Sequence, residues 1–379
     1  MENIKLKNIS TIIMGQSPDS SSYNELGDGV PFFQGKADFG KVNPKVRVYC
    51  SSPTKLAKCF DILMSVRAPV GDVNIADRQC CIGRGLCAIR ANRDVNNKFL
   101  YYFLITQKEK LNSKSTGSTF KAINKSVLEE LEVIAIDLQS QQKIASILDR
   151  AQSLIDKRKE QIEACDELVT SLFYEMFGDP VINPKNYDKY TLNDICEVVT
   201  GNTPSRKEEE NYGDYIEWIK SDNINTSKHY LTKAEEYLSE IGFNKGRSVD
   251  SGAILMTCIA GSLSCIGNVA LTNRTVAFNQ QINGVYAKNN NVSNKFMYMQ
   301  FLLSKEYVQR ASTSGMKGMI SKGVLSKLEF IVPPREDQYK FANLFDEINR
   351  NKKLLEQSLK ELENNFNSLM QRAFKGELF

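Results

Sequence analysis

The sequence contains a single histidine, His229, among its 379 residues. Ser-His-Asp and Cys-His mechanisms each need an imidazole beside the nucleophile, and zinc sites draw on histidines or on paired cysteines. None of the nine cysteines belongs to a Cys-x-x-Cys pair, so the composition argues against both of these kinds of site. His229 lies in the polar run 227–230, and we expect it at the surface.

Several other signatures are missing. No apolar run approaches the roughly 20 residues of a membrane helix, and no basic segment leads into an apolar secretion signal. We therefore expect a cytoplasmic protein with reduced thiols and no membrane partner. The sequence has no Gly-x4-Gly-Lys-Ser/Thr phosphate loop, no Gly-x-Gly-x-x-Gly fingerprint and no Asn/Asp-Pro-Pro-aromatic tetrapeptide. These absences predict a binding protein with no catalytic residues, no metal and no cofactor of its own.

The net charge of the chain is also small. The 49 basic and 45 acidic side chains give a net charge of +4, whereas a stand-alone nucleic-acid binder is usually more basic. Residues 1–137 carry 19 basic and 14 acidic groups, 19 − 14 = +5, while residues 178–337 carry 18 of each. The positive excess therefore belongs to the first part of the chain.

The chain repeats itself. Leu6-x-x-Ile9-x5-Gly15-x-x-Pro18 recurs 186 residues later as Leu192-x-x-Ile195-x5-Gly201-x-x-Pro204. The blocks 127–134 and 324–331 match at an offset of 197, so the offset changes only between matching blocks. This pattern indicates two copies of one unit that differ in loop length.

A long helix is predicted at the end of each copy, because an apolar position recurs every 3.5 residues, as in a coiled-coil seam. The first seam is Ile144, Leu148, Ala151, Ile155, Arg158, Ile162, Cys165, Val169, Leu172 and Met176. The second seam is Phe341, Phe345, Ile348, Lys352, Leu355, Leu359, Leu362, Phe366, Leu369 and Ala373. About 35 residues at a 1.5 Å rise make rods of roughly 50 Å. The aliphatic stems of Arg158 and Lys352 could cover the seam edge, or their charges could fix the register.

The globular part of each copy contains patterns typical of strands and patterns typical of helices, so we expect an α+β fold. Short apolar runs at 61–66 and 252–257 predict strands, and 97–104 and 294–302 predict short amphipathic helices. The predicted organisation is a globular domain at 1–137, a long helix at 138–178, a second globular domain at 179–337 and a second long helix at 338–379.

The binding surface is expected where the two copies differ. The first copy presents Arg67, Arg78 and Arg84 in the stretch 65–93, and the second presents Asn279-Gln280-Gln281 opposite Gly83-Arg84-Gly85. Arginine matches guanine O6 and N7, whereas asparagine and glutamine match adenine N6 and N7. Further candidates follow the aromatic positions: Gln34 and Lys36 in the first copy, Lys220 and Asp222 in the second. The alternative for each residue is an ordinary solvated loop.

A second loop occurs in both copies and suits phosphate oxygens, because it combines hydroxyls, glycine amides and lysines. Its candidates are Thr116, Gly117, Lys121 and Lys125 in the first copy, and Thr313, Gly315, Lys317 and Lys322 in the second. A flexible polar turn explains the pattern equally well. Phe32, Phe33 and Trp218 could stack on bases, but their apolar neighbours favour packing in the core.

The order of these features resembles the specificity (S) subunit of type I restriction-modification systems, the HsdS family. In this chain the order is a variable unit, the motif Leu-x-x-Leu-Glu-x-Ile, the motif Gln-x-Lys and a long helix. The same order then repeats and ends in Phe374-Lys375-Gly376-Glu377-Leu378. The likeness covers nearly the whole chain. The first copy departs from the pattern with Ile136-Asp137 in place of Pro333-Pro334, and with Met176-Phe177-Gly178-Asp179 at its helix end.

The resemblance implies a role and a set of partners. Each globular unit would be a target-recognition domain that reads one half of a bipartite, asymmetric site in double-stranded DNA. The two helices would pair antiparallel with pseudo-two-fold symmetry, set the gap between the half-sites and dock two methyltransferase (M) subunits. S-adenosylmethionine would belong to the M subunits, and ATP and Mg to restriction (R) subunits, whose presence is left open. The alternative from the residues alone is a coiled-coil scaffold whose globular units bind protein partners.

Overall fold

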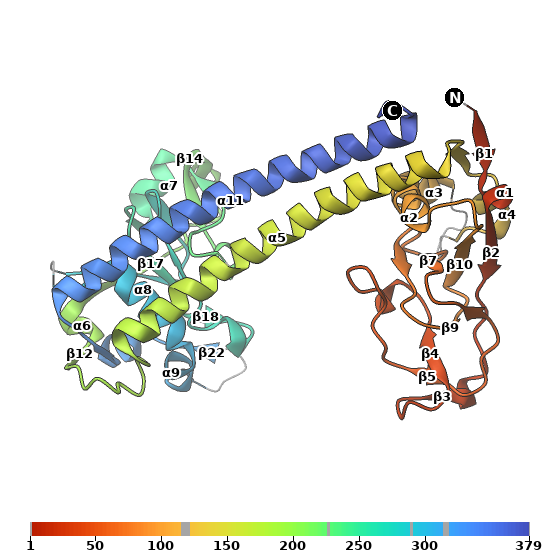
Figure 1. Ribbon diagram of the computed structural model, residues 1–379. Coiled ribbons are helices and arrows are strands. Elements are labelled where there is room, and N and C mark those ends of the chain that lie inside the picture. The colour runs from red at the N-terminus through yellow and green to blue at the C-terminus, as the bar shows by residue number, and fades with distance from the viewer. Residues whose placement is uncertain (1, 115–121, 226–227, 289–290, 314–317, 379) are drawn as a thin grey trace. The chain divides into compact units, whose positions relative to one another are not determined.

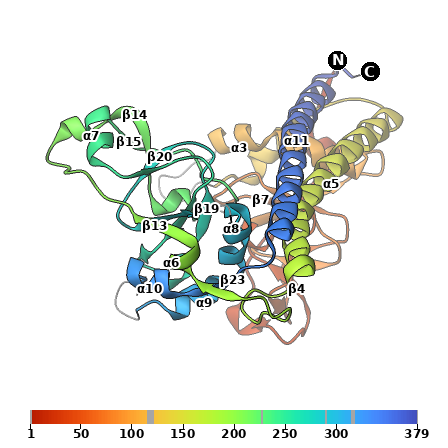
Figure 2. The same ribbon diagram turned by 90° about the vertical axis from the view of Figure 1, so that its left-hand side faces the viewer.

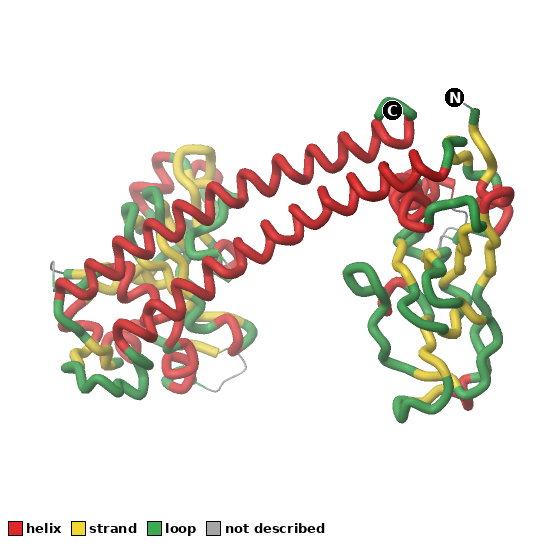
Figure 3. The backbone as a smooth tube through the Cα atoms, viewed as in Figure 1, coloured by secondary structure: helices red, strands yellow, loops and turns green. Residues whose placement is uncertain are grey.

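The computed structural model describes residues 2–114, 122–225, 228–288, 291–313 and 318–378 (Figure 1). The chain forms two compact units, residues 1–160 with 356–379 and residues 161–355. Each unit combines short strands, short helices and parts of two long helices, as the colours of Figure 3 show. The predicted α+β class is therefore confirmed.

The described residues of the first unit form three sheets. Their strand orders are β1-β11, β2-β10-β7-β8 and β3-β5-β4-β9-β6. The strands are β1 (Asn3–Lys5), β2 (Ser10–Met14), β3 (Tyr23–Asn24), β4 (Val30–Phe33), β5 (Tyr49–Cys50), β6 (Leu56–Ala57), β7 (Ile62–Ser65), β8 (Val73–Ile75), β9 (Cys80–Ile82), β10 (Leu86–Ala91) and β11 (Glu132–Ile134). The helices are α1 (Leu6–Ile9), α2 (Asn97–Thr106), α3 (Lys108–Lys114), α4 (Lys125–Glu129) and the first part of α5 (Leu138–Phe177).

The second unit repeats this plan. Its sheets have the orders β12-β23, β13-β21-β17-β19, β15-β14-β20-β16 and β18-β22. The strands are β12 (Lys189–Thr191), β13 (Cys196–Thr200), β14 (Tyr212–Ile219), β15 (Tyr237–Leu238), β16 (Ser248–Val249), β17 (Ile254–Thr257), β18 (Ile259–Ala260), β19 (Val269–Leu271), β20 (Val276–Phe278), β21 (Ile282–Ala287), β22 (Gly318–Met319) and β23 (Glu329–Ile331). The helices are α6 (Leu192–Ile195), α7 (Glu240–Lys245), α8 (Asn294–Leu303), α9 (Lys305–Arg310), α10 (Lys322–Lys327) and the first part of α11 (Arg335–Lys375).

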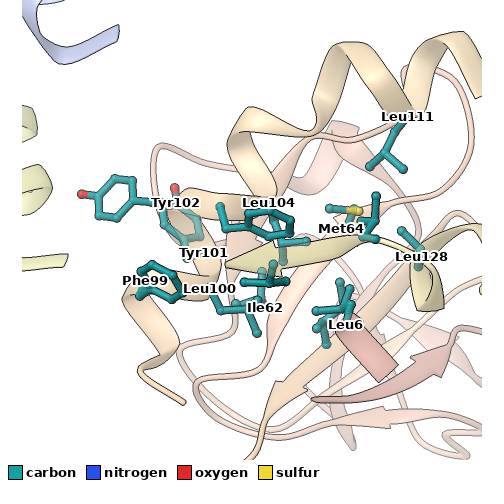
Figure 4. Packing of buried hydrophobic residues seen from close by; sticks show 14 of the residues in the cluster. Leu6, Ile62, Met64, Phe99, Leu100, Tyr101, Tyr102, Leu104, Leu111 and Leu128 are labelled. Carbon is teal, nitrogen blue, oxygen red and sulfur yellow. The ribbon is translucent and has the colours of Figure 1, made fainter. Parts of the chain in front are cut away.

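The short helices α2 and α8 lie inside their units, not on the surface. In α2 every residue from 99 to 104 is buried, and in α8 every residue from 296 to 301 is buried. The prediction of helices at these positions is confirmed, but the prediction that they are amphipathic is wrong, because a helix covered on all sides is apolar all round. Figure 4 shows Phe99, Leu100 and Leu104 among the other core residues of the first unit.

The long helices pack against each other within each unit (Figures 1 and 2). The start of α5 lies beside the end of α11 in the first unit, where Lys159 Nζ is 2.9 Å from Glu363 Oε1. The end of α5 lies beside the start of α11 in the second unit, so the pairing is antiparallel in both. Of the helices in the described part of the chain, none is long and apolar enough to cross a membrane.

The predicted seam holds along most of both helices. Its members are buried or half-buried, among them Leu148, Ile155, Ile162, Val169, Phe345, Lys352, Leu359 and Phe366. At the end of α5 the seam prediction missed Phe173 and Phe177, which are fully buried against the core of the second unit. A helix with 3.6 residues per turn drifts away from a strict 3.5-residue repeat, and this drift turns these phenylalanines inward.

His229 is inside the second unit, so its predicted surface position is wrong. Its side chain is 9% exposed, with Nδ1 3.0 Å from the Tyr298 hydroxyl and Nε2 3.2 Å from Asp166 Oδ1. Lys352 Nζ lies 2.6 Å from both oxygens of Asp166. Burial lowers the pKa of His229, and Asp166 opposes that shift. The charge of Lys352 therefore joins α11 to α5, which favours a register role over simple coverage of the seam.

Both long helices end at a glycine in the left-handed region. Gly178 has φ 75° and Gly376 has φ 78°, a conformation in which a Cβ atom would be strained. Pro333 and Pro334 lie between the end of β23 and the start of α11.

A buried glutamine joins each long helix to its globular part and explains the repeated Gln-x-Lys motif. Gln141 Oε1 accepts from Asn96 N (2.8 Å), and its Nε2 donates to Ile136 O (3.0 Å). Gln338 makes the corresponding pair of bonds, from Ser293 N (3.0 Å) and to Pro333 O (2.8 Å). Each side chain thus satisfies one main-chain group before a core helix and one before a long helix.

We expect Gln338→Leu to destabilise the second unit. Loss of the amide leaves two buried main-chain groups unsatisfied, at about 1–3 kcal/mol for each. The free energy of unfolding in urea, followed by circular dichroism, measures the effect. Gln357→Leu, at an exposed position of the same helix, is the matched control, and equal unfolding midpoints for the two variants would contradict the assignment.

Candidate nucleic-acid interface

Most of the predicted variable residues of the first unit lie at one end of a pair of strands. Strand β4 pairs with β9 in parallel, with Phe33 opposite Ile82. The carboxyl ends of the two strands therefore lie side by side, and Gly83 N donates to Phe33 O (2.8 Å). This pairing places Gln34 beside the loop that carries Arg84.

Two more strands end at the same place. Three main-chain hydrogen bonds bring them in: Gly15 N to Leu86 O (2.9 Å), Gln16 N to Ile82 O (3.0 Å) and Val66 N to Gly85 O (2.9 Å). We call the surface of residues 15–17, 34–36, 66–67 and 83–85 the first strand-end corner. Figure 1 labels the strands that lead into it, β2, β4, β7, β9 and β10.

Glycines allow the close approach of these segments. A Cβ atom on Gly85 would lie 2.2 Å from Gln34 O, and one on Gly15 would lie 2.2 Å from Gly83 O. Since real Cβ atoms do not approach main-chain oxygens so closely, the corner requires glycine at both positions.

The second unit builds the same corner with different side chains. Strand β14 pairs with β20 in parallel, with Ile219 opposite Phe278. The equivalent bonds are Asn279 N to Ile219 O (3.1 Å), Gly201 N to Ile282 O (3.0 Å), Asn202 N to Phe278 O (3.2 Å) and Cys258 N to Gln281 O (2.8 Å). We call residues 201–203, 220–222, 258–259 and 279–281 the second strand-end corner. Its hydrogen bonds make Gln280 the counterpart of Arg84, and Lys220 the counterpart of Gln34.

The three amides of 279–281 have different surroundings. Asn279 is buried, and its side chain is used internally: Oδ1 accepts from Gln281 N (3.0 Å) and Nδ2 donates to Gln281 Oε1 (3.2 Å). Gln280 is exposed and accepts a hydrogen bond from the Thr203 hydroxyl. Of these three side chains, Gln280 is the one that is exposed to solvent. Its amide nitrogen takes no part in the hydrogen bonds named above.

The second predicted loop joins each corner at its described end. Ile123 N donates to Val66 O (3.0 Å), and Ile320 N donates to Cys258 O (2.9 Å). Thr313 pairs with Met319 at the base of the loop in the second unit. Lys125 and Lys322 are the exposed first residues of α4 and α10. The remaining candidates, Thr116, Gly117, Lys121, Gly315 and Lys317, lie outside the described residues.

Arg78 is not brought to the corner. It lies before the start of β9, whereas Arg84 follows the end of that strand, and it is paired with Asp77 at 2.9 Å. Arg90, in the same stretch of sequence, is held by Asp61, which is buried. Of the three arginines predicted from the sequence, Arg67 and Arg84 lie at the first strand-end corner and Arg78 does not.

The charges of the two corners differ. Lys36 pairs with Asp72 at 3.1 Å, whereas Arg67 and Arg84 are exposed and form no salt bridge with any residue that the structure describes. Asp222 is exposed in the second corner. The first corner therefore presents two guanidinium groups that no described carboxylate neutralises.

In the second corner Lys220 is neutralised by Glu236, which also pairs with the nearby Arg206 (2.7 Å). Hydrogen bonds from Lys220 and then Arg206 lower the pKa of Glu236. Arg206 and Glu236 were not among the residues predicted from the sequence. Arg206 could have been found, because it lies two residues after the repeated Pro204.

The aromatic residues near the corners belong to the core, as expected. Phe32, Phe33 and Trp218 are 2%, 1% and 3% exposed, so they cannot stack on an external ligand without rearrangement. Across the described ranges, no three His, Cys, Asp or Glu side chains gather into a group that could hold a metal ion.

We expect Gly85→Ala to destabilise the first unit, because its Cβ would overlap the carbonyl oxygen of Gln34. Overpacking of this kind costs about 1–3 kcal/mol, measurable as a lower urea midpoint. Gly35→Ala is the control, since nothing lies within 4 Å of a Cβ there. If both variants unfold like the parent chain, the close approach is not required.

Known proteins share features with this chain. One relative from Methanocaldococcus jannaschii, named for the specificity subunit of the type I restriction enzyme MjaX, is 48% identical over 165 residues, which are 42% of this chain and 39% of that protein. The MjaIX specificity subunit of the same organism is 28% identical over 230 residues, 54% of this chain and 53% of that protein. The chain thus matches less than two thirds of the length of each.

The fold is shared with a solved structure, the type I restriction-modification S subunit from M. genitalium. The TM-score is 0.59 at 16% identity, over 98% of this chain and 96% of that one. The family model of the type I restriction modification DNA specificity domain matches residues 1–164 and 184–364, which is most of the chain. With both of its copies matched, the chain belongs to the type I restriction modification DNA specificity domain family.

Proposed function

We propose that the chain is the DNA sequence-recognition subunit of a type I restriction-modification complex. Each globular unit reads one half of a bipartite, asymmetric target, and the long helices set the gap and dock two methyltransferase subunits. The observation that carries the proposal is the pair of strand-end corners. Their main-chain hydrogen bonds correspond one by one, while their exposed side chains differ.

Such corners suit base recognition in two related half-sites. A fixed backbone presents each variable side chain at a defined place, and side chains at base edges are what distinguish sequences. The residues proposed to contact bases are Gln34, Lys36, Arg67, Arg84, Lys220, Asp222, Gln280 and Gln281. Lys125, Lys322 and Thr313, with the loops they flank, are proposed to contact phosphates.

A complex in which other subunits supply DNA affinity and catalysis would explain the low net charge of the chain. A net charge of +4 supplies little of the electrostatic attraction that dominates non-specific DNA affinity. We propose that the chain selects the sequence, while the partner subunits add affinity and carry out the chemistry. In that arrangement S-adenosylmethionine lies in the methyltransferase subunits, and ATP and Mg in restriction subunits where the system includes them. Double-stranded DNA and these subunits would place the chain in the cytoplasm.

The test is salt-dependent DNA binding by the full chain assembled with methyltransferase subunits. We expect the logarithm of the association constant to fall linearly with the logarithm of salt concentration, because phosphate contacts release counterions. Random-sequence duplexes, from which bound molecules are recovered and sequenced, should yield a two-part motif. A scaffold for protein partners would assemble with the subunits but select no DNA motif, and that result would reject the proposal.

The spacing role of the helices has its own test. One added heptad in α5 after residue 160, and one in α11 after residue 355, keeps the 3.5-residue seam in phase and lengthens each helix by about 10 Å. At about 3.4 Å per base pair, the gap between half-sites should grow by about three base pairs while both half-sites stay the same. The same heptad after the exposed Ile182 is the control, and an unchanged gap in the helix variant would rule out the spacing role.

A further inference from the structure

We infer that the two strand-end corners carry the same two kinds of base-reading group in exchanged positions. In the first corner an amide, Gln34, follows β4 and a cation, Arg84, lies in the β9–β10 loop. In the second corner a cation, Lys220, follows β14 and an amide, Gln280, lies in the β20–β21 loop. The inference rests on the proposed function, and it assigns an adenine-type and a guanine-type contact to each half-site in opposite order.

The equivalence of these positions comes from the main chain. Gln34 and Lys220 are equivalent because each follows the strand residue whose carbonyl accepts from the parallel neighbour: Phe33 O accepts from Gly83 N, and Ile219 O accepts from Asn279 N. The turns that come next differ in length, since Gln34 N donates to Asp38 Oδ2 (2.7 Å), four residues on, and Lys220 N donates to Asn223 Oδ1 (3.0 Å), three residues on. Arg84 and Gln280 each follow the residue whose N–H bonds to the end of the neighbouring parallel strand.

Arg84 is placed to read a base. Its neighbours Gly83 and Gly85 pack against the main chain of Gln34, which fixes the origin of the side chain. The guanidinium is exposed, and within the described part of the chain no carboxylate pairs with it. A planar fork of this kind matches guanine O6 and N7, while the amide of Gln34 beside it matches adenine N6 and N7.

Gln280 takes the place of Arg84 in the second corner. Its side-chain oxygen accepts from Thr203, which orients the amide. Asn279 is excluded from reading, because it is 6% exposed and both of its side-chain polar atoms bond to Gln281. The adenine-type contact of this corner therefore belongs to Gln280.

Lys220 is positioned by Glu236 and Trp218, whose counterparts in the first unit are Val48 and Phe32. Glu236 holds both Lys220 and Arg206, and the Lys220 ammonium lies 5.4 Å from the ring centroid of Trp218. Trp218 N bonds to Glu236 O (3.0 Å), as Phe32 N bonds to Val48 O (2.9 Å). Glu236 thus stands where the first unit has Val48, and we assign it as a positioning residue that aims the lysine.

The experiment uses Arg84→Gln in the full chain assembled with methyltransferase subunits, with recovery and sequencing of bound duplexes. We expect discrimination at one guanine of the first half-site to fall by roughly 5- to 150-fold, the range for a bidentate contact, with the second half-site unchanged. Arg78→Gln is the matched control, because it makes the same substitution before the opposite end of β9. Gln280→Ala should relax one adenine position of the second half-site alone.

Arg84→Lys separates a base contact from a phosphate contact. A lysine keeps the charge but loses the fork, so it should retain the salt slope while discrimination at that guanine falls. If Arg84→Gln weakens binding to all sequences equally, lowers the salt slope by about one unit and leaves the motif unchanged, Arg84 contacts a phosphate. That result would overturn the inference. An Arg84→Gln motif identical to the parent motif would overturn it as well. Failure of the parent complex to select any motif would instead reject the proposed function.

Glu236 is tested by the same selection. Glu236→Gln frees Lys220 and Arg206 from their shared carboxylate, so preference at one guanine position of the second half-site should weaken while the first half-site stays the same. The urea midpoint reports any general loss of structure. A lower midpoint with an unaltered second half-site would show that Glu236 only stabilises the unit.

Discussion

The parallel pairing of β4 with β9, and of β14 with β20, holds both candidate interfaces in place. In each unit it brings the end of one strand beside the loop after the other, and main-chain hydrogen bonds then add two more strand ends. Because these bonds use N–H and C=O groups, they tolerate any side chain that does not collide. The corner can therefore keep its shape while its exposed residues change, which is the physical basis for the two readings proposed for this fold.

The limits on that freedom are steric and electrostatic. Gly15 in the first copy and Gly201 in the second occupy equivalent positions, and at each of them a Cβ would collide with a main-chain oxygen. Beyond such points the copies diverge, and the divergence concerns charge: the first corner leaves Arg84 unneutralised by any described residue, while Glu236 neutralises Lys220 in the second. The two corners therefore present different fields to a ligand although their backbones correspond.

The junction between each globular part and its long helix is also held by directional hydrogen bonds, here between buried polar groups. Gln141 and Gln338 connect main-chain groups that would otherwise lie unsatisfied in the interior. Ion pairs at matching positions, Lys98 with Asp149 and Lys295 with Asp346, add a second contact between a core helix and a long helix. Each unit thus holds its helices by bonds with defined directions, which apolar packing alone would not provide.

The sequence by itself determined the duplication, the long helices and the places where the copies differ, because offsets and periodicities are local properties that can be counted along the chain. It did not reveal that Asn279 is buried while Gln280 is exposed, that Arg78 and Arg84 lie off opposite ends of one strand, or that His229 is enclosed by Tyr298 and Asp166. Those facts depend on pairing between segments tens of residues apart. Burial and charge pairing are set by such long-range contacts, so only the tertiary structure decided which candidates share a surface.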